Sequence, residues 1–449
     1  MQQNKRYLIW RKYMMNWKIF SLLFLINPII GYSQIQDTLH LTVSQLFDRG
    51  MSCNLKIQAD KLRERITQEQ KKSSKSALYP DIELNLDGGM IGQPVVFEEG
   101  LSKPTFPQAP NWSQDYGISL TQPLYQGGKL RLNIKKSEIE NQIAALATAT
   151  DLSDLKLNLL QIYLELFCAY KQHGILSRNI FESKRRLKDI RKMKEEGIIT
   201  NNDVLRSELQ LIDDSLSLSE TINQIHLSSQ QLDVLLNMDD SYIIKPDSVI
   251  LFMDIPSLSS YDDYISRAYE SNPHMQSLYK EVELSKNNLK IMQAEYLPKV
   301  SLVAGNALQR PISRTLEDKF NNKWNIGISL SLPLSSLYKN NNKVKEAEYE
   351  VLLKLNEKDQ QKQRIRVQMK TAYLKYKEAV NKVKMKNLAI KQSQENYRIM
   401  QNRYMNQLVI LTDLLDANSI YLNSQLQYIT ARAQAIYAYY ELQNICGNL

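Results

Sequence analysis

The sequence YGISLTQPL at residues 116–124 returns as IGISLSLPL at residues 326–334, an offset of 210 residues. In both copies apolar side chains alternate with small or polar ones, which is the pattern of a strand with one apolar and one polar face. Each copy contains a proline near its end, and a long segment without any further proline follows. This recurrence predicts that the chain is two fused copies of one module.

Further landmarks recur in the same order and extend the duplication over most of the chain. Two pairs keep the offset of 210: Tyr163-Leu164 with Tyr373-Leu374, and Asp203-Val204-Leu205 with Asp413-Leu414-Leu415. Upstream, Asn54 matches Asn272 and Pro80 matches Pro298 at an offset of 218. The first copy therefore carries eight extra residues between its two strands, where an exposed loop tolerates an insertion.

Each copy is predicted to contain two short strands, at about residues 81–90 and 115–124 in the first and about 299–307 and 325–334 in the second. In the first strand, Ile82, Leu84 and Leu86 alternate with acidic and amide side chains. A strand of about ten residues crosses an outer membrane when it is tilted. Aromatic residues flank the strands at both ends, as they do at membrane interfaces: Tyr79, Tyr125, Tyr296 and Tyr338 beside the helical segments, and Trp112 and Trp324 at the loop ends.

Four strands cannot close into a barrel, and an open sheet edge in lipid leaves backbone groups unsatisfied at a cost of several kcal/mol each. The chain must therefore obtain strands from elsewhere, and symmetric self-association is the simplest source. Two copies would supply eight strands, a barrel filled by side chains, whereas three would supply twelve and leave room for a lumen. Counting alone leaves other numbers open.

Two long helical hairpins are predicted, at about residues 129–236 and 343–446. Between Lys129 and Met193 the only breaker is Gly174, and between Lys343 and Ile445 there is neither glycine nor proline. Apolar residues recur at coiled-coil steps of three and four: Leu152, Leu155, Leu159, Ile162 and Leu166 in the first copy, and Leu422, Leu426, Ile429, Ala433, Ile436 and Tyr440 in the second. Coiled-coil layers are therefore expected.

Each helical run is interrupted once, by residues 196–202 and by residues 406–412. These segments are predicted hairpin turns. The helix after each turn is expected to start at Asn202 or at Thr412, because such side chains cap helix N-termini. Residues 238–256, which contain two prolines, are the predicted linker between the copies.

The N-terminus, residues 1–33, resembles a secretory signal peptide. A basic region precedes an apolar stretch, and the small residues Gly31 and Ser33 precede the expected cleavage. The mature chain then divides into a first structural repeat at 34–245 and a second at 246–449. An exported, internally duplicated chain is expected.

Composition excludes several other classes of protein. The formal charge of +9 is distributed as mixed Lys and Glu sequence, so no nucleic acid binding is predicted. After the N-terminus no apolar run approaches the roughly 18 residues of a spanning helix. Three cysteines are too few for a disulfide framework. The four histidines lack metal-ligand spacing and no phosphate loop or nucleophile elbow is present, so we predict no metal, no cofactor and no catalytic residue.

With these features in place, the sequence resembles the TolC family of outer-membrane efflux and secretion channels over nearly all of the mature chain. The resemblance rests on three groups of residues: Leu120-Thr121-Gln122-Pro123-Leu124-Tyr125-Gln126-Gly127-Gly128, the prolines in Tyr79-Pro80 and Tyr296-Leu297-Pro298, and the segment from Tyr404 through Asp413-Leu414-Leu415-Asp416-Ala417. It implies a mainly α fold with a membrane β-barrel, in which a homotrimer forms a twelve-stranded barrel in outer-membrane lipid. A long coiled-coil α-helical barrel would continue from it across the periplasm.

The resemblance also implies where the channel narrows. Asp413 and Asp416 align with the acidic positions that line the family's closed periplasmic constriction, and rings of carboxylates would favour cations. Asp203 and Arg206 occupy the equivalent places in the first copy, and an ion pair between Arg206 and Asp416 would help to hold the end shut. An aspartate just after a turn is also a common helix cap, an interpretation that fits Asp413 better than Asp416.

The two turns are the expected docking site for a periplasmic adaptor. Their residues include several apolar side chains where a solvated turn should be polar: Gly197, Ile198 and Ile199 in the first turn, and Gln407, Leu408, Val409 and Ile410 in the second. The family usually has glycine in both turns, and Gln407 departs from that pattern. A second turn of different shape is therefore expected.

The function predicted from these features is a passive exit duct, not an enzyme, in the outer membrane of a Gram-negative bacterium and extending into the periplasm. It would conduct substrates from a periplasmic adaptor and an inner-membrane efflux pump or ABC exporter to the exterior. A drug, a metal ion or a protein is each compatible as cargo. The alternative from another class is a secreted coiled-coil structural or adhesion protein, which explains the helices and leaves the four alternating strands unexplained.

Overall fold

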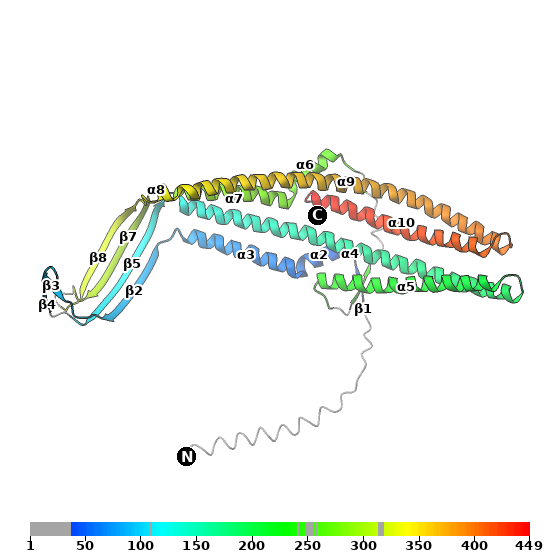
Figure 1. Ribbon diagram of the computed structural model, residues 1–449, viewed down its shortest axis with the longest axis horizontal. Coiled ribbons are helices and arrows are strands. Elements are labelled where there is room, and N and C mark those ends of the chain that lie inside the picture. The colour runs from blue at the N-terminus through cyan, green and yellow to red at the C-terminus, as the bar shows by residue number, and fades with distance from the viewer. Residues whose placement is uncertain (1–36, 108–109, 240–241, 248–255, 257, 313–317) are drawn as a thin grey trace, which may run out of the picture.

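The computed structural model describes residues 37–107, 110–239, 242–247, 256, 258–312 and 318–449. The expected signal peptide lies outside the described residues. The chain is elongated, with an antiparallel sheet at one end and two long helical hairpins extending to the other (Figure 1). The predicted fold class, mainly helical with four strands that alternate apolar and polar residues, is confirmed, and strands of both copies join in one sheet.

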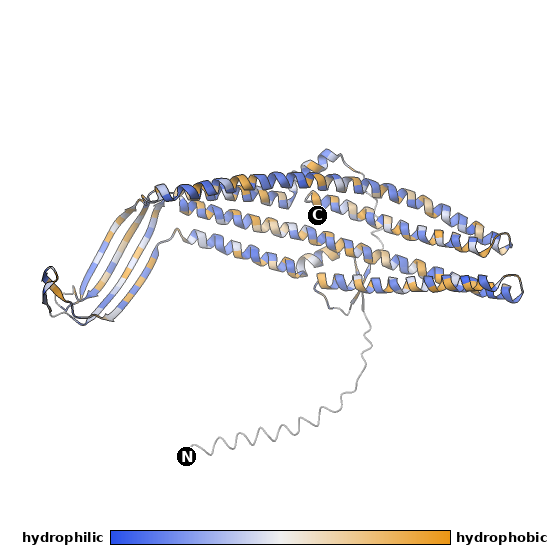
Figure 2. Cartoon of the chain, viewed as in Figure 1, coloured by the Kyte–Doolittle hydropathy of each residue, from blue (hydrophilic) through white to orange (hydrophobic). Residues whose placement is uncertain are grey.

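The sheet consists of β2 (Asp81–Met90), β5 (Trp112–Gln126), β7 (Lys299–Arg310) and β8 (Asn321–Ser331), in the order β2-β5-β7-β8 with all neighbours antiparallel. The register places Leu84 opposite Ile118, and Leu302 opposite Ile328. Apolar side chains therefore share one face, and the alternating colours of the strands in Figure 2 show the same pattern. The apolar face is exposed, as the large accessible surfaces of Leu84 and Ile328 show.

Most helices of the two copies match in length. Residue for residue, α3 (Leu55–Ser76) corresponds to α7 (Pro273–Ala294), and α5 (Asn201–Leu235) to α10 (Leu411–Ile445). The longest helices are α4 (Lys129–Glu195) and α9 (Asn341–Met405), and α9 follows the single turn of α8 (Ser336–Lys339). At 1.5 Å per residue, α4 spans roughly 100 Å.

Two equivalent asparagines join the short and long helices at the middle of the molecule. Asn54 caps α3 and donates from its amide to the carbonyl oxygen of Leu235 at the end of α5, at 2.9 Å. Asn272 caps α7 and donates to the carbonyl oxygen of Ile445 at the end of α10, at 3.1 Å. One side chain in each copy thus satisfies orphan groups of two helix termini at once.

Several short elements were not predicted. The strand β1 (Asp37–Leu41) pairs in parallel with β6 (Tyr242–Pro246), so part of the predicted linker is a strand. Short helices α2 (Val43–Cys53) and α6 (Tyr261–Ser271) precede α3 and α7. At the far end of the sheet, β3 (Val96–Glu99) and β4 (Ser102–Thr105) form a hairpin inside the extra loop of the first copy.

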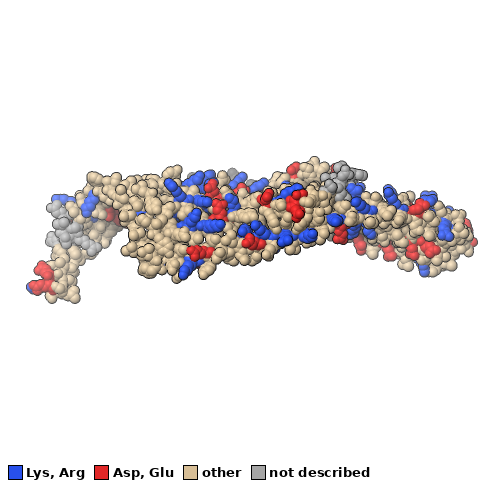
Figure 3. All heavy atoms as spheres, turned by 90° about the horizontal axis from the view of Figure 1, so that it is seen from above, with Lys and Arg blue, Asp and Glu red and all other residues tan. Residues whose placement is uncertain are grey.

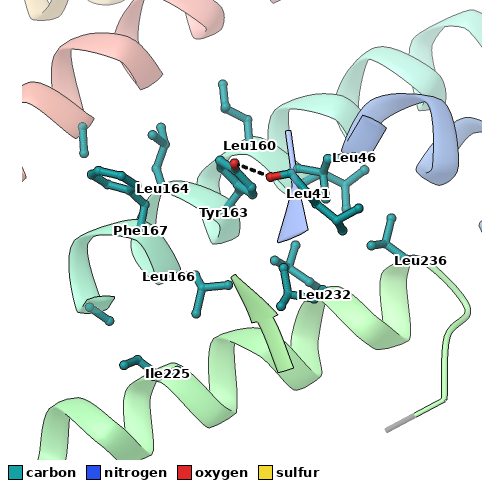
Figure 4. Close-up of a cluster of buried hydrophobic side chains, with 14 of the residues drawn as sticks. Leu41, Leu46, Leu160, Tyr163, Leu164, Leu166, Phe167, Ile225, Leu232 and Leu236 are labelled. Carbon is teal, nitrogen blue, oxygen red and sulfur yellow. Dashed lines mark hydrogen bonds between the residues drawn. The ribbon is translucent and has the colours of Figure 1, made fainter. Parts of the chain in front are cut away.

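The largest core cluster lies where β1 and β6 meet α2, α4 and α5 (Figure 4). Leu46, Leu160 and Leu232 are fully buried there. The hydroxyl of Tyr163 donates to the carbonyl oxygen of Leu41 at 2.7 Å, so the small sheet is fixed to the longest helix of the first copy. Among the described residues, no helix contains an apolar stretch of the length and purity needed to cross a bilayer.

Candidate channel constriction and docking turns

The two turns between the long helices lie at the same end of the molecule, opposite the sheet (Figure 1). In the first turn Gly197 has a φ of 75°, and in the second Gln407 has a φ of 60°. Both turns close with the same backbone hydrogen bonds: Gly197 N to Lys194 O and Ile198 N to Met193 O, and Gln407 N to Tyr404 O and Leu408 N to Arg403 O, each at 2.9 Å. The expectation that Gln407 changes the shape of the second turn is therefore wrong, because Gln407 itself adopts the left-handed conformation.

The helices after the turns begin earlier than expected. The N-cap of α5 is Thr200, not Asn202, and its backbone N–H donates to Asp203 Oδ2 at 3.0 Å. The N-cap of α10 is Ile410, not Thr412. For α5 the sequence pointed to the wrong residue because Thr200, three residues before Asp203, closes a reciprocal capping box, which Asn202 does not. At α10 the N-cap residue Ile410 has no side-chain cap, so the capping signal of Thr412 was misleading. Asp203 thus has a structural role as a capping partner.

The acidic residues of the predicted constriction lie in the first turns of α10. Asp413 and Asp416 are both exposed, and both lie within six residues of the helix start. Arg206 on α5 is also exposed, but its guanidinium donates to the hydroxyl of Thr412 at 2.8 Å. Within the chain, the expected ion pair between Arg206 and Asp416 is not formed in the part that the structure describes. Arg206 nevertheless links the two hairpins at Thr412, the residue before Asp413.

The apolar residues of the turns divide into two groups. Ile199 and Val409 pack against a buried cluster that closes this end of the helical bundle, which contains Leu187, Ile190, Val204, Tyr404, Leu411 and Leu414. Ile198, Leu408 and Ile410 point away from it, with 45%, 66% and 67% of their surfaces exposed. Ile199 and Val409 therefore stabilise the tip, whereas the other three form an apolar surface that nothing in the described chain covers.

A buried polar network behind the turns was not predicted. The amide of Asn418 on α10 donates to Asn179 Oδ1 at 3.1 Å, and Asn179 on α4 donates to Asp214 Oδ2 at 2.7 Å. Gln210 donates to the other carboxylate oxygen of Asp214 at 3.0 Å. The sequence did contain a signal for this network. Asn179 and Asp214 are polar residues at helix positions whose spacing places them in line with buried neighbours. Such a network fixes the register of the helices that share it.

Asp214 is 4% exposed, and burial raises the pKa of its carboxyl above the ordinary value of 3.8. Hydrogen bonds from Gln210 and Asn179 and the nearby positive charge of Arg186 oppose that shift only in part. The folded chain therefore retains this proton to a higher pH than the unfolded chain does. The contribution of Asp214 to stability is largest at low pH and is lost as the pH rises through the raised pKa.

We expect Asp214→Asn to raise the thermal unfolding midpoint at pH 7 by roughly 1–3 °C, because the amide carries no charge to desolvate. Gln210 must turn its amide so that its oxygen accepts from the new NH2 group, while Asn179 still donates to the remaining oxygen. The gain over the unmodified protein should shrink as the pH falls towards 4. The matched control is Glu220→Gln, which neutralises an exposed carboxylate of the same helix that does not contribute to the pKa shift of Asp214 and should show neither effect. Midpoints measured by circular dichroism across that pH range would test this, and a gain that is independent of pH would contradict the assignment.

The fold and the tip geometry together define a class of elongated chain, with an open antiparallel sheet at one end and the paired turns of two helical hairpins at the other. The sequence matches the family model described as outer membrane efflux protein over residues 51–238 and again over residues 264–448. The chain therefore belongs to the outer membrane efflux protein family. Its two separate matches correspond to the two copies of the internal duplication.

Solved structures of outer-membrane proteins share this fold. The outer membrane protein VceC from Vibrio cholerae aligns with a TM-score of 0.76 at 16% identity, covering 90% of this chain and 96% of that one. The CmeC outer membrane channel from Campylobacter jejuni aligns with a TM-score of 0.73 at 15% identity, covering 90% and 85%. The open state of the MtrE outer membrane channel from Neisseria gonorrhoeae gives 0.74 at 14% identity, covering 90% and 88%. A comparison with curated protein sequences gave no significant match.

The family confirms the resemblance on which the sequence analysis relied. At these identities the solved structures establish the fold, and they do not establish the roles of individual residues. The roles of the constriction and turn residues therefore remain predictions. In the part of the chain that the structure describes, no group of three or more His, Cys, Asp or Glu side chains is arranged to hold a metal ion.

Proposed function

We propose that this protein is the exit duct of a tripartite efflux or type I secretion system, assembled as a homotrimer in the outer membrane. The single observation that carries the proposal is the sheet, which has an exposed apolar face and two open edges at β2 and β8. Lipid covers the apolar face, and pairing with neighbouring copies satisfies the edges. Three copies give a barrel of twelve strands around a lumen lined by the polar face.

The helical hairpins support the same assembly. Because α5 packs on α4, α4 on α10, and α10 on α9, the outer edges of this helical layer are α5 and α9. Exposed leucine and isoleucine side chains run along α5 at steps of four and three: Leu205, Leu209, Ile212 and Leu216. On α9, exposed Met385, Leu388 and Ile399 form a second apolar line. A head-to-tail contact of α5 with α9 of the next copy covers both lines and closes a ring.

Charge favours this same pairing of edges. Helix α5 carries six Asp and Glu residues and one Arg, whereas α9 carries 16 Lys and Arg against seven Asp and Glu. Opposite net charges on the two edges attract unlike edges and repel like ones. The ring therefore assembles in one direction, and α9 edges do not pair with each other.

At the end opposite the barrel, the trimer brings three copies of Asp413 and Asp416 around the channel axis. Carboxylates at a narrow point attract cations and repel anions. The exposed Ile198, Leu408 and Ile410 form the surface on which a periplasmic adaptor docks, and an inner-membrane pump or ABC exporter supplies the energy. Transport through the duct itself is passive.

The test is ion conduction by the purified protein in planar bilayers. We expect a mostly closed, cation-selective channel, and Asp413→Ala with Asp416→Ala should raise its conductance and lower its cation preference severalfold, since fixed charges lining a cleft contribute roughly several kT. The control removes two exposed carboxylates of α6, by Asp262→Ala with Glu270→Ala. Absence of any channel would refute the proposed function, whereas unchanged selectivity in the tip variant would refute only the assigned constriction.

A further inference from the structure

The positive charge of the chain is concentrated on one helix, which contradicts the expectation of an even mixture. The net charge of α9 is +9, equal to the formal charge of the entire chain. Between Lys362 and Lys391 ten cations accompany a single carboxylate, that of Glu378. The face of the molecule seen from above in Figure 3, where α9 lies, shows many Lys and Arg side chains along the helical part.

Five cations of α9 are in register with the helical packing. Every seventh residue of α9 faces the inside of the bundle, and Met369, Tyr376, Val383 and Tyr404 in this series are buried. The residue that follows each of the first five members is a cation: Lys370, Lys377, Lys384, Lys391 and Arg398. All five are exposed. Seven residues are two turns of a coiled-coil helix, so these side chains form one straight line, the cation column.

Among the residues that the structure describes, the middle of the cation column has no ion-pair partner. At the end nearer the sheet, the ammonium of Lys370 lies over the ring of Tyr261, 4.9 Å from its centroid. At the end nearer the turns, Arg398 pairs with Glu395 at 2.6 Å. The three lysines between them form no ion pair with any residue that the structure describes. These three lysines are therefore free to pair with carboxylates of another molecule.

The cation column lies on the flank of α9 away from the groove between the hairpins. That groove, of about 910 Å³, is lined by Lys375 and Lys382 of α9 and by Glu220 of α5. Lys377 and Lys384 line a separate hollow of about 340 Å³, together with Leu258 and Val380.

The neighbouring subunit of the proposed trimer does not neutralise the cation column. Asp213 lies seven residues before Glu220 on α5, so both carboxylates lie on the flank that faces the groove. On the other flank of α5, Glu208 is already paired with Arg191 at 2.6 Å. The acidic residues of α5 therefore approach Lys375 and Lys382 of the next copy and leave the cation column open.

We propose that the cation column is a docking surface for an α-helix of a periplasmic partner that carries carboxylates at seven-residue intervals. The proposal rests on the proposed function, which places α9 in the periplasm beside the duct. Neighbouring cations are roughly 10.5 Å apart along the axis and the whole column is roughly 42 Å long. Only another helix running alongside repeats its side chains at that interval.

Two other classes of anion fit the geometry less well. A membrane surface is a plane, whereas the cations form a single line. A flexible polyanion does not require register, and the cations here keep register over five repeats. Exposed Leu374, four residues after Lys370, adds an apolar side chain beside the charges, as is typical of a coiled-coil contact.

The experiment measures binding of two synthetic helical peptides of identical composition to the full-length protein in detergent, by fluorescence anisotropy. One peptide has glutamate at every seventh position and the other has the same glutamates shuffled. We expect the first to bind roughly tenfold or more tightly than the second, and the difference to disappear at high salt. Lys377→Glu with Lys384→Glu and Lys391→Glu should abolish the preference.

The matched control reverses three exposed cations of α9 off the column and away from the proposed subunit contact, by Lys345→Glu with Arg364→Glu and Arg366→Glu, and should keep the preference. Equal binding of both peptides, an equal loss in the control, or equally strong binding of polyglutamate or anionic lipid vesicles would overturn the proposal. Conduction in planar bilayers is measured on the same preparation. A conducting protein that does not discriminate between the peptides refutes this inference alone, and a discriminating protein that does not conduct refutes the proposed function alone.

Discussion

Replacing both Leu209 and Leu216 of α5 by lysine is expected to convert the trimer into monomers. These side chains are 61% and 59% exposed in the single chain and lie seven residues apart on one line. Burial of a leucine contributes about 1.5–3 kcal/mol, and a ring of three copies contains three equivalent contacts. The substitution removes this burial and also places two cations against α9, which is already strongly basic. Mass in detergent, with the detergent subtracted, should fall from three chains to one.

The sign of the introduced charge identifies the partner edge. If α5 faces the basic α9 of the next copy, Leu209→Glu with Leu216→Glu should disrupt the trimer less than the lysine pair does. The control Ser215→Lys with Gln231→Lys adds the same charge to exposed positions off the line and should leave the trimer intact. If lysine and glutamate disrupt the trimer equally, α9 is not the partner of α5. A stable monomer of the unmodified chain with native strand content would refute the trimer itself.

The regular parts of this fold were predictable because their signals repeat. The alternation of apolar and polar residues predicted the first strand at about residues 81–90, and the structure has it at Asp81–Met90. The turns were found because an interruption at the same place in two copies is more informative than either one alone. Periodicity of two and of three and a half residues thus predicts strands and long helices even where no single residue is diagnostic.

The features that were not predictable depend on contacts between distant parts of the chain. The strand β1 exists because β6 lies beside it, some two hundred residues later, and five residues cannot show that partner in their own pattern. Gln407 was expected to alter its turn, but the packing of Val409 and Leu411 beneath it holds the same backbone shape. Tertiary packing at that position outweighs the cost of a left-handed glutamine, about 1–2 kcal/mol.

The largest functional effect is expected at the tip, where Ile198→Glu together with Leu408→Glu should abolish export. Both side chains are exposed, and neither belongs to the buried tip cluster, so the change removes partner contacts without opening the core. Loss of two interface residues worth about 2 kcal/mol each weakens docking roughly a thousandfold. Trimer formation and outer-membrane insertion should persist, because the tip lies roughly 100 Å from the sheet along α4.

Substituting Gly197 and Ile199 by bulky charged residues should also stop export, but by a less direct route. Ile199 packs in the tip cluster and Gly197 needs a positive φ, so that pair disturbs the turn as well as the surface. The variant with both Ile198 and Leu408 replaced tests the loss of docking contacts alone, because both side chains are exposed. Its control, Asn202→Glu with Gln401→Glu, adds the same charge at exposed polar positions nearby. Export would be measured as accumulation of a pump substrate in cells. Normal export by the Ile198 and Leu408 variant, or loss of its trimer, would show that these turns are not the docking end.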